Sequence, residues 1–167
     1  MDTKTLLKIV QTSINYVKDE IPYCYGKNTI EEGMDCAGLT MRLFKDSLNL
    51  EIGRTGFEML NSELFIKIFE FESLIAGDII INARMSPENG SSKIQNKKNV
   101  NEEDIEIIHI ETILNNSTVL STEIDGTVNY YEKEKDEDFY VGLRSCPDLA
   151  HAYAWANFLY FNSWKGD

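Results

Sequence analysis

The chain has few of the residues that build metal centres or disulfide frameworks. Its 167 residues include two histidines and three cysteines, with no His-Glu-x-x-His motif and no metal-ligand spacing among the cysteines. Zinc sites need several such ligands brought together, so we expect no metal and no cofactor. An odd number of cysteines is also a poor basis for a disulfide framework, and a reducing compartment is the simpler interpretation.

The sequence also lacks a basic cluster and a long apolar run. Its formal net charge is −12, and no stripe of Lys and Arg offsets the acidic excess. Such a surface repels phosphate backbones, which argues against nucleic-acid binding. No segment approaches the ~18 apolar residues of a membrane span. The N-terminus has no basic region followed by an apolar stretch, so we expect no Sec signal and a cytoplasmic or phage-associated protein.

What is present is the pattern of one α+β domain over residues 1–167, a length that fits a single core. Apolar spacing predicts helices over 3–19 and about 36–48, and a less regular third helix over 57–71. The chain after Gly77 favours β-structure, and antiparallel pairing is expected because turn signals separate the segments. The expected strands are 79–82, 105–114, 118–124, 127–131 and 139–143, the last of which closes the sheet.

Two further segments complete the expected architecture. The polar stretch between the first two strands, about residues 85–104, predicts an exposed insertion loop. Pro147 begins a pattern typical of an extra C-terminal helix over about residues 147–164. Helices followed by an antiparallel sheet indicate an α+β fold. The helix over 36–48 is apolar on more than one side, so we expect it to run through the middle of the domain.

Cys36 is the candidate nucleophile. It lies where a loop turns into a helix, directly after Asp35, a good N-cap residue. The free N–H groups and positive dipole end of a helix start favour a thiolate, which is the nucleophilic form of cysteine. A small buried core cysteine is the commoner alternative. Position alone leaves the two interpretations about even.

His109 is the candidate base, since the second histidine, His151, lies in the predicted C-terminal helix. Alternation along the strand places His109 on the same face as Glu111. Alone, His109 is better interpreted as a satisfied histidine in a sheet, but beside a helix-start cysteine it favours a Cys–His couple. The chain has neither a glycine-rich phosphate loop nor a Gly-x-Ser-x-Gly elbow. Paired-carboxylate hydrolysis stays open, although 28 acidic residues make any chosen pair arbitrary.

Five short segments, taken in order, form a specific series. They are Ile21-Pro22-Tyr23-Cys24-Tyr25-Gly26, Asp35-Cys36-Ala37-Gly38-Leu39, Gly53-Arg54-Thr55, Leu74-Ile75-Ala76-Gly77-Asp78-Ile79-Ile80 and Ile108-His109-Ile110-Glu111-Thr112-Ile113. The series resembles the motifs of NlpC/P60 cysteine peptidases and covers roughly residues 20–125. The resemblance implies a papain-like fold, in which a central helix that bears the cysteine packs on an antiparallel sheet.

The resemblance also implies an activity, that of a thiol protease acting on the cell wall. Its substrate would be the peptide stem of peptidoglycan, cut at the amide bond between the γ-carboxyl of D-glutamate and a diamino acid. Cys36 would form the acyl-enzyme, and His109 would activate the thiol and protonate the leaving amine. The backbone N–H of Cys36 is a candidate oxyanion donor. Tyr23 and Asp35 would bind the substrate.

Three positions depart from the family pattern. Ala37 replaces the usual serine and removes a hydroxyl that can contact substrate. Glu111 replaces a small residue on the face of His109, where it would narrow the pocket or alter the pKa of His109. The third polar residue of the family, usually His, Asn or Gln, falls at Ser121.

The register of the hairpin decides whether Ser121 can orient the histidine. If residues 114–116 form a three-residue turn, His109 pairs directly with Ser121, and Glu123 lies diagonally on the same face. We favour Ser121 as the third catalytic residue. Glu123 and a water molecule stay open as alternatives, because a carboxylate orients an imidazole better than a hydroxyl does. Glu111 and Glu123 are also candidate substrate-binding residues.

Two other functions stay open. A related papain-like amidase or acyltransferase would use the same dyad on a different amide or ester. A non-catalytic domain of the same fold would bind cell-wall peptide or a protein partner, and the departures at positions 37, 111 and 121 favour that alternative.

Overall fold

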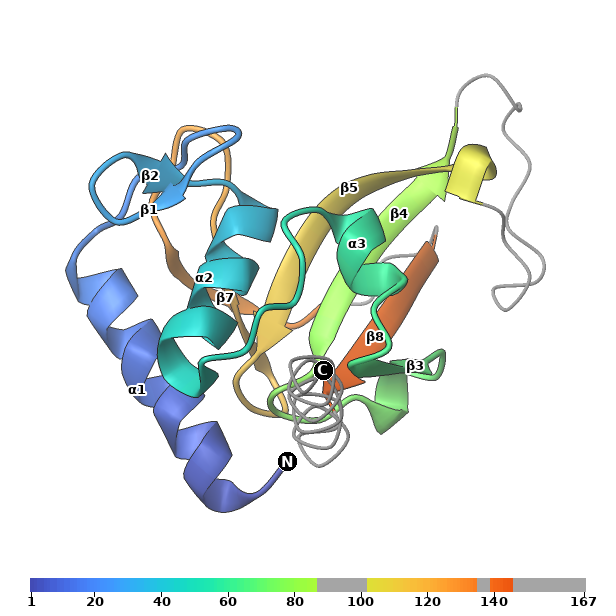
Figure 1. Cartoon of the computed structure of the whole chain (residues 1–167), viewed down its shortest axis with the longest axis horizontal. Helices are drawn as coiled ribbons and strands as arrows, with labels where there is room; N and C mark the ends of the chain where they lie inside the picture. Colours follow the sequence, from blue (N-terminus) through green and yellow to red (C-terminus); the bar gives the residue numbers. More distant parts are fainter. Residues whose placement is uncertain (87–101, 135–138, 146–167) are drawn as a thin grey trace, which may run out of the picture.

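In the computed structural model of the chain, the described residues form three α-helices that lie beside a six-stranded sheet (Figure 1). The structure describes residues 1–86, 102–134 and 139–145. No helix within these ranges is long and apolar enough to cross a membrane. The predicted helix over 147–164, with His151, lies outside the described residues.

Helices α1 (Thr3–Lys18) and α2 (Cys36–Leu48) pack against each other and begin close to the predicted residues. The Tyr16 hydroxyl of α1 donates a hydrogen bond to the Asp46 carboxylate of α2 at 2.6 Å. Helix α2 ends at Asn49, which adopts the left-handed conformation that commonly terminates helices. The helix that carries Cys36 is therefore fixed at both ends and along one side.

The sheet is antiparallel, and its strands do not follow chain order. In spatial order the strands are β3 (Phe65–Ile68), β8 (Phe139–Ser145), β4 (Ile79–Met85), β5 (Ile105–Ile113), β6 (Thr118–Ser121) and β7 (Asn129–Glu132). Strand β8 thus lies between β3 and β4, and does not close the sheet at an edge as expected. A small hairpin of β1 (Asn28–Thr29) and β2 (Gly33–Met34) precedes α2.

The predicted third helix over 57–71 is wrong for most of its length. Helix α3 covers only Gly56–Leu60, where Thr55 and Glu58 form a capping box. The chain then forms β3 and a short 3-10 helix, η1 (Phe71–Ser73). Strand β3 exists because it pairs with β8, a partner about 75 residues later in the chain. No local pattern reveals such a pairing.

The hydrophobic core lies mainly between α2 and the sheet. Fully buried side chains of the helix, including Leu39, Leu43 and Phe44, meet sheet residues such as Ile81 and Ile110. Each side chain of this kind contributes about 1.5–3 kcal/mol when it is fully buried. A smaller cluster, with Ile80, Ile113 and Tyr140 among its members, covers the opposite face of the sheet. The two cores fix β4 and β5, which carry the residues beside Cys36.

The expected insertion over 85–104 is described only at its ends. Strand β4 continues to Met85, and a 3-10 helix, η4 (Glu102–Asp104), leads into β5. Residues 87–101 lie outside the described residues. The β4–β5 ladder contains one irregularity, because Asn82 lies across from His109 whereas Ala83 lies across from Ile107. Ile108 is the extra residue of this bulge, and bulges of this kind re-aim neighbouring side chains.

Candidate active site

Cys36 is the first residue of α2, as expected. Asp35 caps the helix, since its Oδ1 accepts a hydrogen bond from the Gly38 N–H at 2.7 Å. Gly38 lets the preceding loop pass close to the helix, because a Cβ at this position would collide with the carbonyl oxygen of Lys27. The helix start and the loop before it therefore form one packed unit around the cysteine.

Asp35 is the centre of a hydrogen-bond network behind the cysteine. Its Oδ2 accepts from the Gly26 N–H at 2.8 Å, and Arg54 donates to both oxygens, at 3.0 and 2.7 Å. Arg54 is held in turn, because its backbone N–H donates to Glu58 of the α3 capping box. Asp35 thus ties the Gly26 loop and the Arg54 loop to the start of α2. Its predicted contact with substrate stays a prediction.

His109 lies on β5 beside the bulge, and the structure brings it together with Ser121. The His109 Nε2 atom is 2.7 Å from the Ser121 Oγ atom. Ser121 ends β6 and is only 1% exposed, so its hydroxyl is buried. Glu111 Oε1 is 3.6 Å from the same nitrogen, which is beyond hydrogen-bond range.

The contact between His109 and Ser121 is diagonal, and the expected direct pairing is wrong. The turn between β5 and β6 comprises residues 115–117, one residue later than expected. Continuing the observed register places Glu111 across from Ser121. Because side chains alternate with a period of two along a strand, this shift leaves His109 and Ser121 on the same face. The imidazole is long enough to span the diagonal.

Strand β5 also reaches Cys36 through its backbone. Strand β6 pairs with Thr112 and Ile113 of β5, and no strand of the described residues pairs on that side with the part of β5 before Thr112. The Ile110 N–H faces the Cys36 sulfur there, together with the N–H groups of Ala37 and Cys36 itself. The residue after His109 therefore lies directly beside the nucleophile.

The pKa of the Cys36 thiol is raised above its usual value of 9.0, contrary to the expected lowering at a helix start. Burial is the largest cause, because it disfavours the charged thiolate, and the negative charge of Asp35 acts in the same direction. The three N–H groups that face the sulfur favour the thiolate but do not outweigh these effects. The resting thiol is protonated at neutral pH.

Burial lowers the pKa of His109 below its usual value of 6.5, and the charge of Glu123 offsets this only in part. The imidazole is therefore neutral at neutral pH. Glu123 is exposed, and Ser121, not Glu123, contacts the imidazole nitrogen. The site thus holds a neutral thiol and a neutral imidazole, the protonation state in which a histidine can act as a general base.

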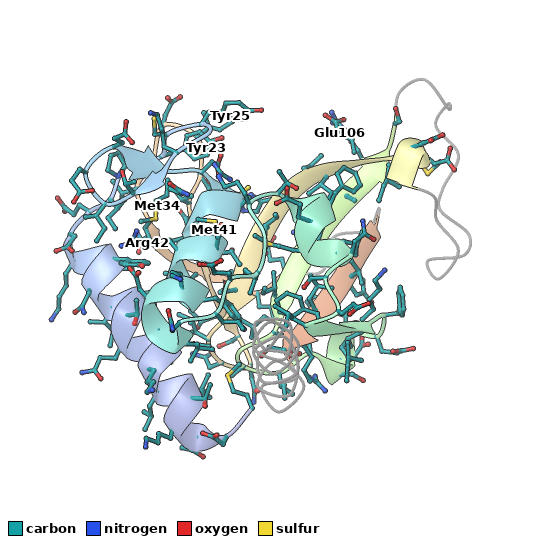
Figure 2. All side chains as sticks on the ribbon, viewed as in Figure 1. Tyr23, Tyr25, Met34, Met41, Arg42 and Glu106 are labelled. Atoms are coloured by element: carbon teal, nitrogen blue, oxygen red, sulfur yellow. The ribbon has the colours of Figure 1, made fainter. Side chains whose placement is uncertain are left out.

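Cys36 and His109 line the same cleft, which has a volume of about 960 Å³. Tyr23 and Asp35 also line it, whereas Glu111 and Glu123 are not among the described residues that line it. The Tyr23 pKa is raised by burial and by nearby Cys36 and Asp35, which places the phenol near the nucleophile. Tyr23 and Tyr25 lie on one side of the cleft, and Glu106 lies on β5 at the other (Figure 2).

Some residues of the site were not foreseen from the sequence. Arg54 lies in a segment that resembles a family motif, but its pairing with Asp35 appears only in the structure. Arg84 and Glu106 meet across the β4–β5 ladder and also line the cleft. Their pairing depends on a register that includes the bulge, so no local pattern could have predicted it.

No protein-family model and no curated protein matches the chain, but several solved structures do. The NlpC/p60 domain of the peptidoglycan hydrolase SagA matches with a TM-score of 0.58 and 17% identity, over 81% of this chain and 96% of that one. A protein of the NLP/P60 family, similar to lipoprotein, from Staphylococcus aureus gives 0.60 and 18%, over 87% of this chain and 42% of that one.

A third similar structure is described as non-catalytic. RipD from Mycobacterium tuberculosis, an NlpC/p60 domain protein adapted to peptidoglycan binding, gives a TM-score of 0.59 and 12% identity, over 86% of this chain and 98% of that one. At such identities these matches show the fold. In this chain α2 packs on the antiparallel sheet. The chain therefore has the papain-like α+β fold of NlpC/P60 domains.

Proposed function

We propose that the chain is a cysteine peptidase of the NlpC/P60 family that hydrolyses amide bonds in the peptide stems of peptidoglycan. One observation carries the proposal: Cys36 and His109 line the same cleft, and Ser121 holds the imidazole at Nε2. A cysteine, a histidine and a third polar group in this order are the parts that acyl transfer through a thioester requires. The fold shared with the SagA domain, a peptidoglycan hydrolase, supports the choice of substrate.

The hydrogen bond to Ser121 distinguishes the roles of the two imidazole nitrogens of His109. Because Nε2 is engaged by Ser121 Oγ, Nδ1 is the nitrogen left for the Cys36 thiol. A neutral imidazole that carries its proton on Nε2 donates to the serine oxygen and keeps an accepting lone pair on Nδ1. This tautomer can remove the proton from a protonated thiol, which is the resting state that the raised thiol pKa favours.

The reaction then follows from these positions. The Cys36 sulfur attacks the substrate carbonyl as His109 takes the thiol proton. The backbone N–H of Cys36, at the free start of α2, stabilises the oxyanion. The C–N bond breaks, His109 protonates the leaving amine, and water hydrolyses the thioester with His109 again as base. Because burial lowers the His109 pKa, we expect activity to be lost only as the pH falls below 6.5.

The proposed scissile bond joins the γ-carboxyl of D-glutamate to a diamino acid. Tyr23 lies beside Cys36 on the wall opposite β5, where it can contact the acyl part of the substrate. The cleft volume of about 960 Å³ is of the size that holds a short peptide. A related papain-like amidase or acyltransferase would use the same dyad on another amide or ester.

A second candidate function is binding without catalysis. The raised thiol pKa and a hydroxyl in place of a stronger orienting group favour it. It would make the chain a peptidoglycan-binding domain, and the fold shared with RipD, a non-catalytic protein, supports this alternative.

The test is digestion of synthetic stem peptides, read by mass spectrometry, with the wild type and the Cys36→Ala variant. Cys24→Ala is the matched control, because Cys24 is also a free cysteine but does not line the cleft. We expect cleavage after γ-D-glutamate by the wild type and by Cys24→Ala, and none by Cys36→Ala. Binding of the peptides without cleavage by any of the three proteins would establish the binding function instead.

A further inference from the structure

Arg54 lines the same cleft as Cys36, and the proposed mechanism assigns it no role. Its guanidinium donates to both oxygens of Asp35, from Nη1 at 3.0 Å and from Nη2 at 2.7 Å. The Nη2 atom also donates to the Lys27 carbonyl oxygen at 3.3 Å, and the Arg54 backbone N–H donates to Glu58. Arg54 is therefore held at its backbone and at its guanidinium, which fixes the charged group against Asp35.

The Asp35 carboxylate uses its acceptor capacity inside the protein. Besides Arg54, the Gly38 N–H donates to Oδ1 at 2.7 Å and the Gly26 N–H donates to Oδ2 at 2.8 Å. A carboxylate has about four acceptor positions, and these contacts fill them. The side chain is only 11% exposed, and within the described part of the chain Arg54 is the one cation in ion-pair contact with it. Arg54 thus supplies the positive charge that a buried carboxylate requires.

This carboxylate directly precedes the nucleophile in the chain. Burial is the largest cause of the raised pKa of the Cys36 thiol, and the charge of Asp35 acts in the same direction. A cation bound to Asp35 weakens the second effect, because the sulfur then faces an ion pair and not a lone anion. Loss of that cation would leave the negative charge of Asp35 unbalanced beside the thiol, which would disfavour the thiolate further.

The other ionisable side chains of the cleft do not supply this positive charge. Among the described residues they are Tyr23 and Tyr25 before β1, Arg84 on β4, and Glu106 and His109 on β5. The phenols bring no positive charge, and burial lowers the pKa of His109, which keeps the imidazole neutral at neutral pH. Arg84 and Glu106 pair with each other at 2.9 Å. The charge of Asp35 is therefore balanced locally by Arg54.

We propose that Arg54 is a positioning residue of the site: by holding both oxygens of Asp35, it balances the carboxylate charge beside the Cys36 sulfur and keeps the thiol reactive. The proposal rests on the proposed function in that Cys36 is the nucleophile, but it does not depend on the substrate. The direction of the effect separates it from a purely structural role. If Arg54 only held the loops together, its loss would loosen the site and speed attack on the sulfur, whereas loss of charge balance slows it.

The test is the rate of alkylation of each cysteine by iodoacetamide in the full-length protein, read by mass spectrometry at low ionic strength and about pH 8. Arg54→Met should slow Cys36 roughly threefold, because a thiol pKa raised by about one unit is partly offset by a more nucleophilic thiolate. Asp35→Asn keeps a good N-cap residue and leaves Arg54 unbalanced, so Cys36 should react roughly threefold faster. The double variant lacks both charges and should return to within about twofold of the wild-type rate.

Arg42→Met is the matched control. Arg42 also pairs with a carboxylate of α2, Asp46, at 2.8 Å, but neither residue lines the cleft, so Cys36 should keep its wild-type rate. Cys24 is the internal reference, because it is a free cysteine that does not line the cleft. If Arg54→Met fails to fold, both cysteines accelerate together, and Asp35→Asn then decides alone.

Two results would overturn the role of Arg54. One is a Cys36 rate that is unchanged or raised in folded Arg54→Met, and the other is a rate that does not rise in Asp35→Asn. Cleavage of stem peptides is scored separately with the wild type. The expected order of alkylation rates without cleavage refutes the peptidase alone, and cleavage without that order refutes the role of Arg54 alone.

Discussion

Replacing Ser121 with alanine tests the third member of the proposed site. The change removes one buried oxygen, 2.7 Å from His109 Nε2, and leaves that nitrogen without its partner. A hydrogen bond between neutral groups contributes about 0.5–1.5 kcal/mol, and one to a charged group about 1.5–3 kcal/mol. The imidazole becomes charged only when it takes the thiol proton, so the difference, about 1–1.5 kcal/mol, is lost in the transition state. That loss corresponds to about a tenfold fall in kcat.

The assay is the steady-state rate of stem-peptide cleavage, with unfolding in urea followed in parallel. Ser121→Ala should lower kcat about tenfold and leave KM nearly unchanged, because the serine touches the base and not the substrate. Ser47→Ala is the control, since Ser47 is also buried and donates its hydroxyl to the Leu43 carbonyl within α2. It should cost comparable stability without a fall in kcat.

Glu123→Gln separates the two candidates for the orienting group. Glu123 is exposed and acts on His109 only through its charge, so its removal should lower the imidazole pKa slightly and change kcat by about twofold at most. The reasoning fails if Ser121→Ala retains the wild-type kcat, or if Glu123→Gln is the more damaging of the two. In the latter case the carboxylate orients the imidazole in the working enzyme.

Three further outcomes follow from the contacts. Alkylation of Cys36 by iodoacetamide, followed by mass spectrometry, should still be accelerating at pH 9, because burial raises the thiol pKa; a plateau by pH 7 would contradict this. Arg144→Met should lower the free energy of unfolding by roughly 3 kcal/mol, because it strips the guanidinium from the buried Asp78 carboxylate. Urea denaturation measures that loss, and a change below about 1 kcal/mol would refute it. Gly38→Ala should cost about 1–3 kcal/mol in the same assay and abolish cleavage, since the new methyl group would displace the Lys27 backbone; a stable, active variant would show that the loop can move aside.

The elements that carry the dyad could be predicted because their signals are local. Asp35 before an apolar repeat marks the start of a helix, and the predicted span of 36–48 matches α2. The isoleucine-rich run around His109 likewise matches β5 within one residue. The low number of histidines also made the base predictable, since a chain with two histidines offers few candidates.

What the sequence could not provide depends on distant partners. The apolar spacing over residues 57–71 predicts a helix, whereas β3 forms there because it pairs with β8, which is distant in the chain. The contact between His109 and Ser121 could be predicted even from the wrong register, because the expected and the observed register both place the two side chains on one face of the sheet. The ion pair of Arg84 and Glu106 was missed entirely, since the bulge at Ile108 sets which residues meet.

A helix start predicts a lowered pKa for the Cys36 thiol, whereas the structure raises it. This difference also depends on residues that are distant in the chain, and it affects the proposed mechanism. A helix start is visible in sequence, whereas the burial that opposes it is not. Asp35 has two opposed effects, because it caps the helix whose N–H groups favour the thiolate, yet its own charge disfavours it. In the proposed mechanism the thiolate therefore forms as the thiol proton passes to His109, since the raised thiol pKa disfavours it at rest. The same proton transfer turns the imidazole into the general acid that protonates the leaving amine, so the efficiency of the proposed reaction depends on how well Ser121 holds the imidazole that receives the proton.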